Sequence, residues 1–244
     1  MPPVTLWKVW KPTFKPFCKM ETKKLSVLVT GSTGMVGEGV LQVCLQHPAV
    51  EKVIALNRRS IGFSHPKLIE ILLPDFHRLK TVETQLKGLD ACFHCMGISS
   101  IGTDEATYKD ITYTLSILLG ETMSRLNPGT VFCYLSGAGT DATETSKLSW
   151  ARLKGRTENE LARMPFKALY RYRPGFIKPL LGAKHVQSFY KYVNWMFPIG
   201  KALFPDGFSS IEEIGRSMIQ VALREDESKI LAGKDIRRLS GQLL

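Results

Sequence analysis

Three glycines, Gly31, Gly34 and Gly37, follow an apolar run over residues 25–30 and lead into a helical pattern. This layout is typical of a turn that binds the pyrophosphate of a dinucleotide, because glycines allow a tight turn and let phosphates approach the following helix N-terminus. An ordinary strand-to-helix turn is the alternative. The expected contacts are Gly31, Ser32, Thr33, Gly34, Met35, Val36 and Gly37.

The next expected strand ends at Asn57, twenty residues after Gly37, and is followed by Arg58 and Arg59. An NAD site usually has an acidic residue here that accepts hydrogen bonds from the ribose hydroxyls. This segment has none, and two guanidinium groups suit a 2′-phosphate through charge-assisted hydrogen bonds. The segment therefore predicts NADP(H), with NAD(H) as the weaker choice. A solvated arginine pair is the alternative.

Two later strand ends complete the expected cofactor site. Asp75 follows the third strand, where its carboxylate is placed to accept a hydrogen bond from the adenine amino group. Cys95, Met96 and Gly97 close the fourth strand, where we expect them to line the ribose of the cofactor.

These residues need a regular framework, and the chain supplies one by alternating strand-like and helical segments. We expect strands at 25–30, 53–57, 68–73, 91–96, 131–136 and 168–173. We expect helices at 36–46, 79–87, 106–126, 150–163, 185–196 and 209–223. This order predicts an α/β fold, a Rossmann-like doubly wound parallel sheet, in one domain over 24–244. Residues 176–244 would form a short C-terminal cap on the substrate side.

The composition is that of an ordinary globular protein, with 244 residues of which 44% are hydrophobic and 23% charged. No uninterrupted apolar stretch approaches the roughly 20 residues of a transmembrane helix. The net charge of +11 raises the question of a nucleic-acid partner. No basic helix or reading motif accompanies the charge, so we expect no nucleic acid to bind.

Residues 1–23 differ from the rest and form a basic-aromatic leader that we expect to be flexible. Six lysines between residues 8 and 24, against Glu21, supply +5 of the net charge of +11. Prolines among them prevent a sustained helix. A flexible tail, a true start at Met20, or a weak association with a membrane surface remain open.

The five cysteines predict reduced thiols, because their number is odd, most fall in core-like segments and no secretory signal precedes them. This usage predicts a cytoplasmic protein. Cys92, His94 and Cys95 resemble a metal cluster, but neighbouring strand residues point to opposite faces, so we expect no metal site.

Four segments together resemble one family. They are Thr30 to Gly37, Tyr134-Leu135-Ser136, Lys154 within Ala151 to Gly155, and Arg173-Pro174-Gly175. The chain resembles the short-chain dehydrogenase/reductase superfamily in its extended, epimerase/dehydratase-like form, near the Tat-interacting-protein oxidoreductase group. The resemblance covers roughly residues 24–175 and is specific for the superfamily but not for a substrate.

The resemblance implies roles for four residues. Ser136 would polarise a substrate carbonyl, Lys154 would hold the nicotinamide ribose, and Pro174 would contact the carboxamide. The proton-donating tyrosine expected four residues before the lysine is Trp150 here. An indole N–H does not give up its proton near neutral pH, so Trp150 can orient a substrate but cannot act as the general acid. A Ser136 that merely ends its strand is the alternative.

We therefore expect an oxidoreductase with altered chemistry, acting on acceptors such as quinones, flavins or activated enones. A non-catalytic protein that senses NADP(H) as a regulator or scaffold is the first alternative. A sugar-nucleotide epimerase or dehydratase is the second. The family also implies a homodimer through the helix at 106–126, which the sequence alone does not establish.

Overall fold

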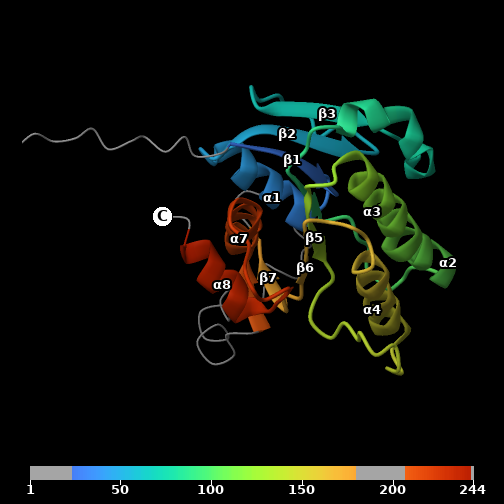
Figure 1. Ribbon diagram of the computed structural model, residues 1–244. Coiled ribbons are helices and arrows are strands. Elements are labelled where there is room, and N and C mark those ends of the chain that lie inside the picture. The colour runs from blue at the N-terminus through green and yellow to red at the C-terminus, as the bar shows by residue number, and fades with distance from the viewer. Residues whose placement is uncertain (1–23, 180–206, 243–244) are drawn as a thin grey trace, which may run out of the picture.

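A seven-stranded parallel sheet forms the centre of the protein, with strand order β3-β2-β1-β4-β5-β6-β9 (Figure 1). The computed structural model describes residues 24–179 and 207–242. The strands are β1 (Leu25–Thr30), β2 (Val50–Asn57), β3 (Leu68–Leu72), β4 (Ala91–His94), β5 (Val131–Leu135), β6 (Ala168–Tyr172) and β9 (Ile230–Leu231). The order reverses beside β1, which is where a doubly wound sheet binds its ligand. The predicted Rossmann-like fold class is confirmed.

Helices cover both faces of the sheet (Figure 1). One face carries α1 (Met35–Gln46), α7 (Ile211–Leu223) and α8 (Gly233–Gly241), whose apolar side chains pack with the strands into one core. The other carries α3 (Leu115–Leu126), α4 (Ser149–Leu161) and the 3₁₀ segment η1 (Phe76–Leu86), which enclose a second core. Burial on both faces explains why these strands read as apolar runs rather than alternating patterns.

The predicted helix at 106–126 is broken into three pieces. They are α2 (Glu105–Lys109), a π-helical turn η2 (Asp110–Thr114) and α3. In the π turn the Thr112 carbonyl accepts from the hydroxyls of Ser116, at 2.8 Å, and Thr157, at 3.4 Å. Side chains thus satisfy a carbonyl next to an irregular turn. The helical hydrophobic period does not reveal such a turn, because the apolar positions continue through it.

Three other elements begin or end at residues that differ from the predicted ones. The expected helix at 79–87 is η1, which begins at Phe76 because the Asp75 carboxylate caps it by accepting from the His77 N–H at 3.0 Å. The fourth strand ends at His94 rather than at residue 96, and β2 begins at Val50, three residues earlier than expected.

The C-terminal part holds elements that the sequence did not predict. Strands β7 (Phe176–Lys178) and β8 (Phe208–Ser210) form a separate parallel pair, and β9 and α8 complete the main sheet and one helical layer. A capping box between Ser210 and Glu213 starts α7, so the helix predicted at 209–223 begins at Ile211. The helix expected at 185–196 and the leader at 1–23 lie outside the described residues.

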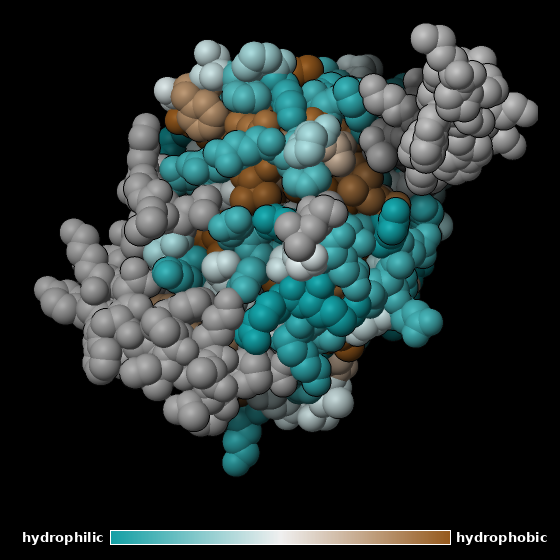
Figure 2. All heavy atoms as spheres, turned by 90° about the vertical axis from the view of Figure 1, so that its left-hand side faces the viewer, coloured by the Kyte–Doolittle hydropathy of each residue, from teal (hydrophilic) through white to brown (hydrophobic). Residues whose placement is uncertain are grey.

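Among the helices that the structure describes, none is long and apolar enough to cross a bilayer. Figure 2 shows the side that lies on the left in Figure 1, where hydrophilic side chains cover most of the described surface. Apolar side chains show there mainly in the upper half, between polar ones.

Candidate functional site: an open dinucleotide cleft

The glycine turn between β1 and α1 has no room for side chains at two positions. Gly31 has a φ of +71°, and a Cβ added there would lie 2.6 Å from the Cys95 carbonyl oxygen. A Cβ on Gly37 would lie 2.2 Å from the Gly31 carbonyl oxygen. The turn therefore needs glycine at both positions, and it presents the N-terminus of α1 to the cleft above the sheet.

A cleft of about 530 Å³ opens beside this turn. It gathers residues that were expected at the site from five separate parts of the chain. Those lining it are Gly34, Met35, Val36, Cys95, Met96, Gly97, Ser136, Trp150, Lys154 and Pro174.

A second hollow of about 740 Å³ continues past the shared wall at Met96 and Gly97. Arg58 and Asp75 line it, as expected for the adenosine end. The predicted residues that line neither hollow are Gly31, Ser32, Thr33, Gly37 and Arg59. Both arginine side chains are exposed, and within the described residues neither makes an ion pair or a side-chain hydrogen bond. Their guanidinium groups are thus available to an anion.

Lys154 lies on α4 and points toward the end of β5. Its Nζ donates a hydrogen bond to the Ser136 carbonyl oxygen. Burial lowers the pKa of Lys154, while the negative charge of Glu158, one helical turn further on, opposes that shift. The hydrogen bond to the Ser136 carbonyl holds the Lys154 side chain in the wall of the cleft.

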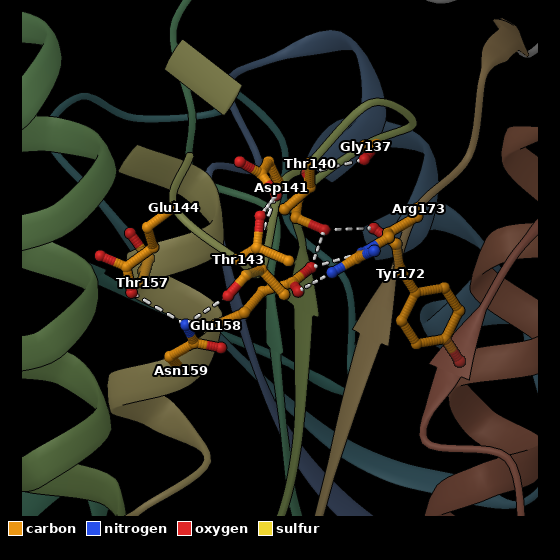
Figure 3. Close-up of polar contacts among 12 residues, drawn as sticks. Gly137, Thr140, Asp141, Thr143, Glu144, Thr157, Glu158, Asn159, Tyr172 and Arg173 are labelled. Carbon is orange, nitrogen blue, oxygen red and sulfur yellow. Dashed lines mark hydrogen bonds and ion pairs between the residues drawn. The ribbon is translucent and has the colours of Figure 1, made fainter. Parts of the chain in front are cut away.

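The Ser136 hydroxyl is hydrogen-bonded within the protein. It donates to the Glu158 Oε1 at 2.5 Å, and the Arg173 Nε donates to the same oxygen at 3.0 Å. The Arg173 Nη2 and the Glu158 Oε2 complete an ion pair, and the Glu158 side chain is fully buried. Figure 3 shows Glu158 reaching from α4 toward Arg173, which follows β6. Polarisation of a substrate carbonyl by Ser136 would require its hydroxyl to turn away from Glu158, and that role stays a prediction.

Glu158 was missed by the sequence reasoning, although a signal was present. It lies four residues after Lys154 and shares a helix side with buried Gly155 and Leu161. A carboxylate among buried positions indicates a buried partner of opposite charge. Hydrogen bonding to Glu158 raises the pKa of Arg173.

Trp150 occupies the first turn of α4 and packs on the loop that follows β5. A Cβ added to Gly139, where φ is +82°, would lie 2.9 Å from the Trp150 Cη2. The ring therefore needs a glycine beneath it. Its position in the cleft matches the expectation, but an indole supplies no proton for catalysis.

No other group in the described cleft replaces the missing acid. Among residues 24–179 and 207–242, no tyrosine, histidine or carboxylate lines the 530 Å³ cleft. Cys95 lines it, but burial raises the pKa of its thiol to about 12. Tyr134 belongs to β5, and its side chain is buried in the core beneath α3, α4 and η1. Tyr108 lies in a hollow between α2 and α4. Among the described residues, the titratable groups that line the cleft are therefore Lys154 and Cys95.

His94 is a neutral core residue. Its side chain is fully buried, its Nδ1 lies 2.7 Å from the Thr30 Oγ1, and its Nε2 lies 2.9 Å from the Ser116 Oγ. The Ser116 hydroxyl already donates to the Thr112 carbonyl, so it accepts from the His94 Nε2–H. Burial lowers the pKa of His94 to about 3. In the described part of the chain no group of His, Cys, Asp or Glu side chains could hold a metal ion.

The fold and the cleft together define a protein of the Rossmann-fold class. Residues 27–148 match the NAD dependent epimerase/dehydratase family, and the chain belongs to that family. Its resemblance to the extended short-chain dehydrogenase/reductases is thereby confirmed.

Solved structures support the fold. The chain superposes on a UDP-N-acetylglucosamine 4-epimerase of Methanobrevibacter ruminantium with a TM-score of 0.62 and 18% identity, covering 86% of this chain and 77% of that one. It superposes on L-sorbose reductase of Gluconobacter frateurii, complexed with NADPH and L-sorbose, with a TM-score of 0.61 and 11% identity, covering 87% and 96%. At these identities the likeness concerns the fold alone.

Sequence relatives correct the expected location. The chain is 26% identical over 231 residues to "Protein FMP52, mitochondrial" of Saccharomyces cerevisiae, covering 88% of this chain and 96% of that protein. It is 30% identical over 161 residues to "Protein fmp52, mitochondrial" of Aspergillus clavatus, covering 62% and 66%. These names point to mitochondria, so the prediction of a cytoplasmic protein was wrong. Cys44, Cys92, Cys95 and Cys133 are buried and unpaired, and thiols enclosed in a core do not report the compartment.

Proposed function

We propose that this protein is an NADP(H)-binding oxidoreductase that delivers hydride to acceptors which take their proton from water. Quinones, flavins and activated enones are such acceptors. The observation that carries the proposal is the composition of the described cleft, which is lined by Lys154 and has an indole in place of a general acid at Trp150.

The residues present fit a nicotinamide dinucleotide. Gly31 and Gly37, which have no room for a Cβ, hold the turn tight, and Gly34, which lines the cleft, would let a pyrophosphate reach the N-terminus of α1. Lys154 would bind the nicotinamide ribose, and Pro174 would lie against the carboxamide. Arg58 and Arg59 would bind a 2′-phosphate, since Asn57 stands where an NAD site has its acid.

A bound reduced nicotinamide supplies a hydride, that is, one proton together with two electrons. The protein's part is to fix the ribose through Lys154 and to shape the acceptor side of the cleft with Trp150. A quinone or an enone that gains a hydride becomes an anion, which water protonates without a protein acid. A simple ketone gains much more from a positioned acid, typically about 10²–10⁴-fold in rate.

A second candidate is a protein that binds NADP(H) without turnover and acts through a partner. The Ser136 hydroxyl favours this candidate, because it donates to Glu158 and is not free to donate to a substrate carbonyl. The other hydroxyl of the family, that of the tyrosine, is replaced by the indole of Trp150. An epimerase or dehydratase of nucleotide sugars is disfavoured by Trp150, since the family's tyrosine is missing.

The test is NADPH oxidation by the full chain against quinone, flavin, enone and simple ketone panels. We expect turnover with the first three classes and little with ketones. Trp150→Tyr should gain at least about tenfold in ketone reduction, because it restores a general acid. Trp150→Phe is the matched control, with an aromatic ring and no donor. NADPH binding without oxidation by any acceptor would favour the second candidate.

A further inference from the structure

A single carboxylate organises the turn that carries the two arginines. Glu70 lies on β3, opposite Ala55 of β2. Its Oε1 accepts hydrogen bonds from the Ile61 N–H at 2.8 Å and from the Asn57 Nδ2 at 3.3 Å. Its Oε2 accepts from the Ser60 hydroxyl at 2.7 Å. The turn after β2 therefore wraps around one side chain of the neighbouring strand.

The same network reaches the glycine turn. The Asn57 Oδ1 accepts from the Ser32 hydroxyl at 2.7 Å, and both side chains are almost completely buried. Asn57 thus connects Glu70 on one side with the pyrophosphate-binding turn on the other. The chain of contacts fixes the two cofactor-binding segments relative to each other.

The position of Glu70 differs from that of a ribose-binding acid. In an NAD site the acid stands at the end of the second strand and offers free oxygens to the ribose hydroxyls. Glu70 stands on the next strand, and both of its oxygens already accept from the turn. A carboxylate whose oxygens are engaged in this way acts on the shape of the turn rather than on the ligand.

Arg58 and Arg59 lie between Asn57 and Ser60, whose side chains Glu70 holds, and both arginines are exposed. Arg58 lines the 740 Å³ hollow. The turn closes at Gly62, whose φ is +77° and whose N–H donates to the Ser60 hydroxyl at 3.2 Å. The backbone on both sides of the arginines is therefore held, while their guanidinium groups stay unpaired within the described residues.

We infer that Glu70 is a positioning residue that sets the cofactor preference, by holding the arginine turn in the form that recognises a 2′-phosphate. This inference rests on the proposed preference for NADP(H). Preorganisation of this kind raises affinity by removing the cost of ordering the turn when the ligand binds. Glu70 should therefore matter for NADPH and 2′,5′-ADP, and much less for NADH and 5′-AMP.

The experiment compares dissociation constants of NADPH, NADH, 2′,5′-ADP and 5′-AMP for the full chain and its variants, by calorimetric titration. Glu70→Ala should weaken NADPH and 2′,5′-ADP by about tenfold and leave NADH and 5′-AMP within about twofold. Glu70→Gln keeps one acceptor oxygen, so its affinity for NADPH and 2′,5′-ADP should lie between those of the wild type and Glu70→Ala. Glu51→Gln, at the other end of the β2 region and outside this turn, is the matched control and should change nothing.

Each outcome has a distinct meaning. Equal losses for all four ligands would show a merely structural role and overturn the inference. Weaker NADH with stronger NADPH in Glu70→Gln would also overturn it, since Glu70 would then be the ribose-binding acid. A wild-type chain that binds NADPH no better than NADH would instead refute the proposed cofactor preference itself. Thermal unfolding of each variant without ligand verifies that the folded protein is being compared.

Discussion

The buried ion pair under the cleft gives the most quantitative prediction. Glu158 is fully buried and accepts from the Ser136 hydroxyl and from two nitrogens of Arg173. Glu158→Gln preserves the size of the side chain and an oxygen for Ser136, but it removes the charge that balances the guanidinium. The variant therefore isolates the ionic part of the contact.

The expected loss follows from the burial of the two partners. Removing one partner of a buried pair usually costs about 3–5 kcal/mol. The Arg173 side chain retains 20% exposure, so water can solvate the unpaired guanidinium in part. We therefore expect the free energy of unfolding to fall by about 2–3 kcal/mol. This corresponds to a fall of roughly 4–12 °C in melting temperature for a chain of this size.

The assay is urea and thermal unfolding of Glu158→Gln beside Glu160→Gln. Glu160 lies on the same helix in a surface pair with Arg163, so its variant should stay within about 0.5 kcal/mol of wild type. Adding Arg173→Met to Glu158→Gln should recover stability, because it removes the unpaired charge. A loss below about 1 kcal/mol for Glu158→Gln, or no recovery in the double variant, would refute the reasoning.

Three further predictions concern the turn, the cleft and the core. Gly37→Ala should abolish NADPH binding in titrations, because its Cβ would lie 2.2 Å from a backbone oxygen; retained affinity would contradict the turn geometry. Lys154→Met should weaken NADPH by about tenfold or more while leaving 2′,5′-ADP unchanged, since Lys154 serves the nicotinamide end; equal losses would contradict that placement. His94 has a pKa lowered to about 3, so below about pH 6.5 the unfolded chain binds the extra proton and stability falls, by up to about 1.4 kcal/mol per pH unit. His94→Gln should flatten this dependence between about pH 6.5 and 4 in unfolding titrations, and an unchanged slope would contradict it.

Much of the fold could be predicted because its signals are local. Six strands were expected, and each is present. The signal is clearest in β1 and β4, which are buried at every position. Strand β9, of two residues, and the pair β7 and β8, of three residues each, are too short to produce a pattern. The π turn at Asp110–Thr114 was not predicted, because apolar residues continue through it as they would through a regular helix.

The candidate site was predictable where one segment carries the signal. The glycine turn was found because spacing along the chain defines it, and Lys154 was found because its segment resembles a known family. Glu158 and Glu70 were not found, because their importance depends on partners brought by other elements. Arg173 comes from the end of β6, and the donors to Glu70 come from the turn after β2. Such pairings depend on sheet register, which no single segment encodes.

The central claim is that the glycine turn and the arginine turn together bind an NADP-type dinucleotide. Calorimetric titration of the purified full chain with NADPH and then with NADH tests it most directly. We predict saturable binding of one NADPH per chain, at least about tenfold tighter than NADH. Absence of heat with either coenzyme, or tighter binding of NADH, would contradict the account.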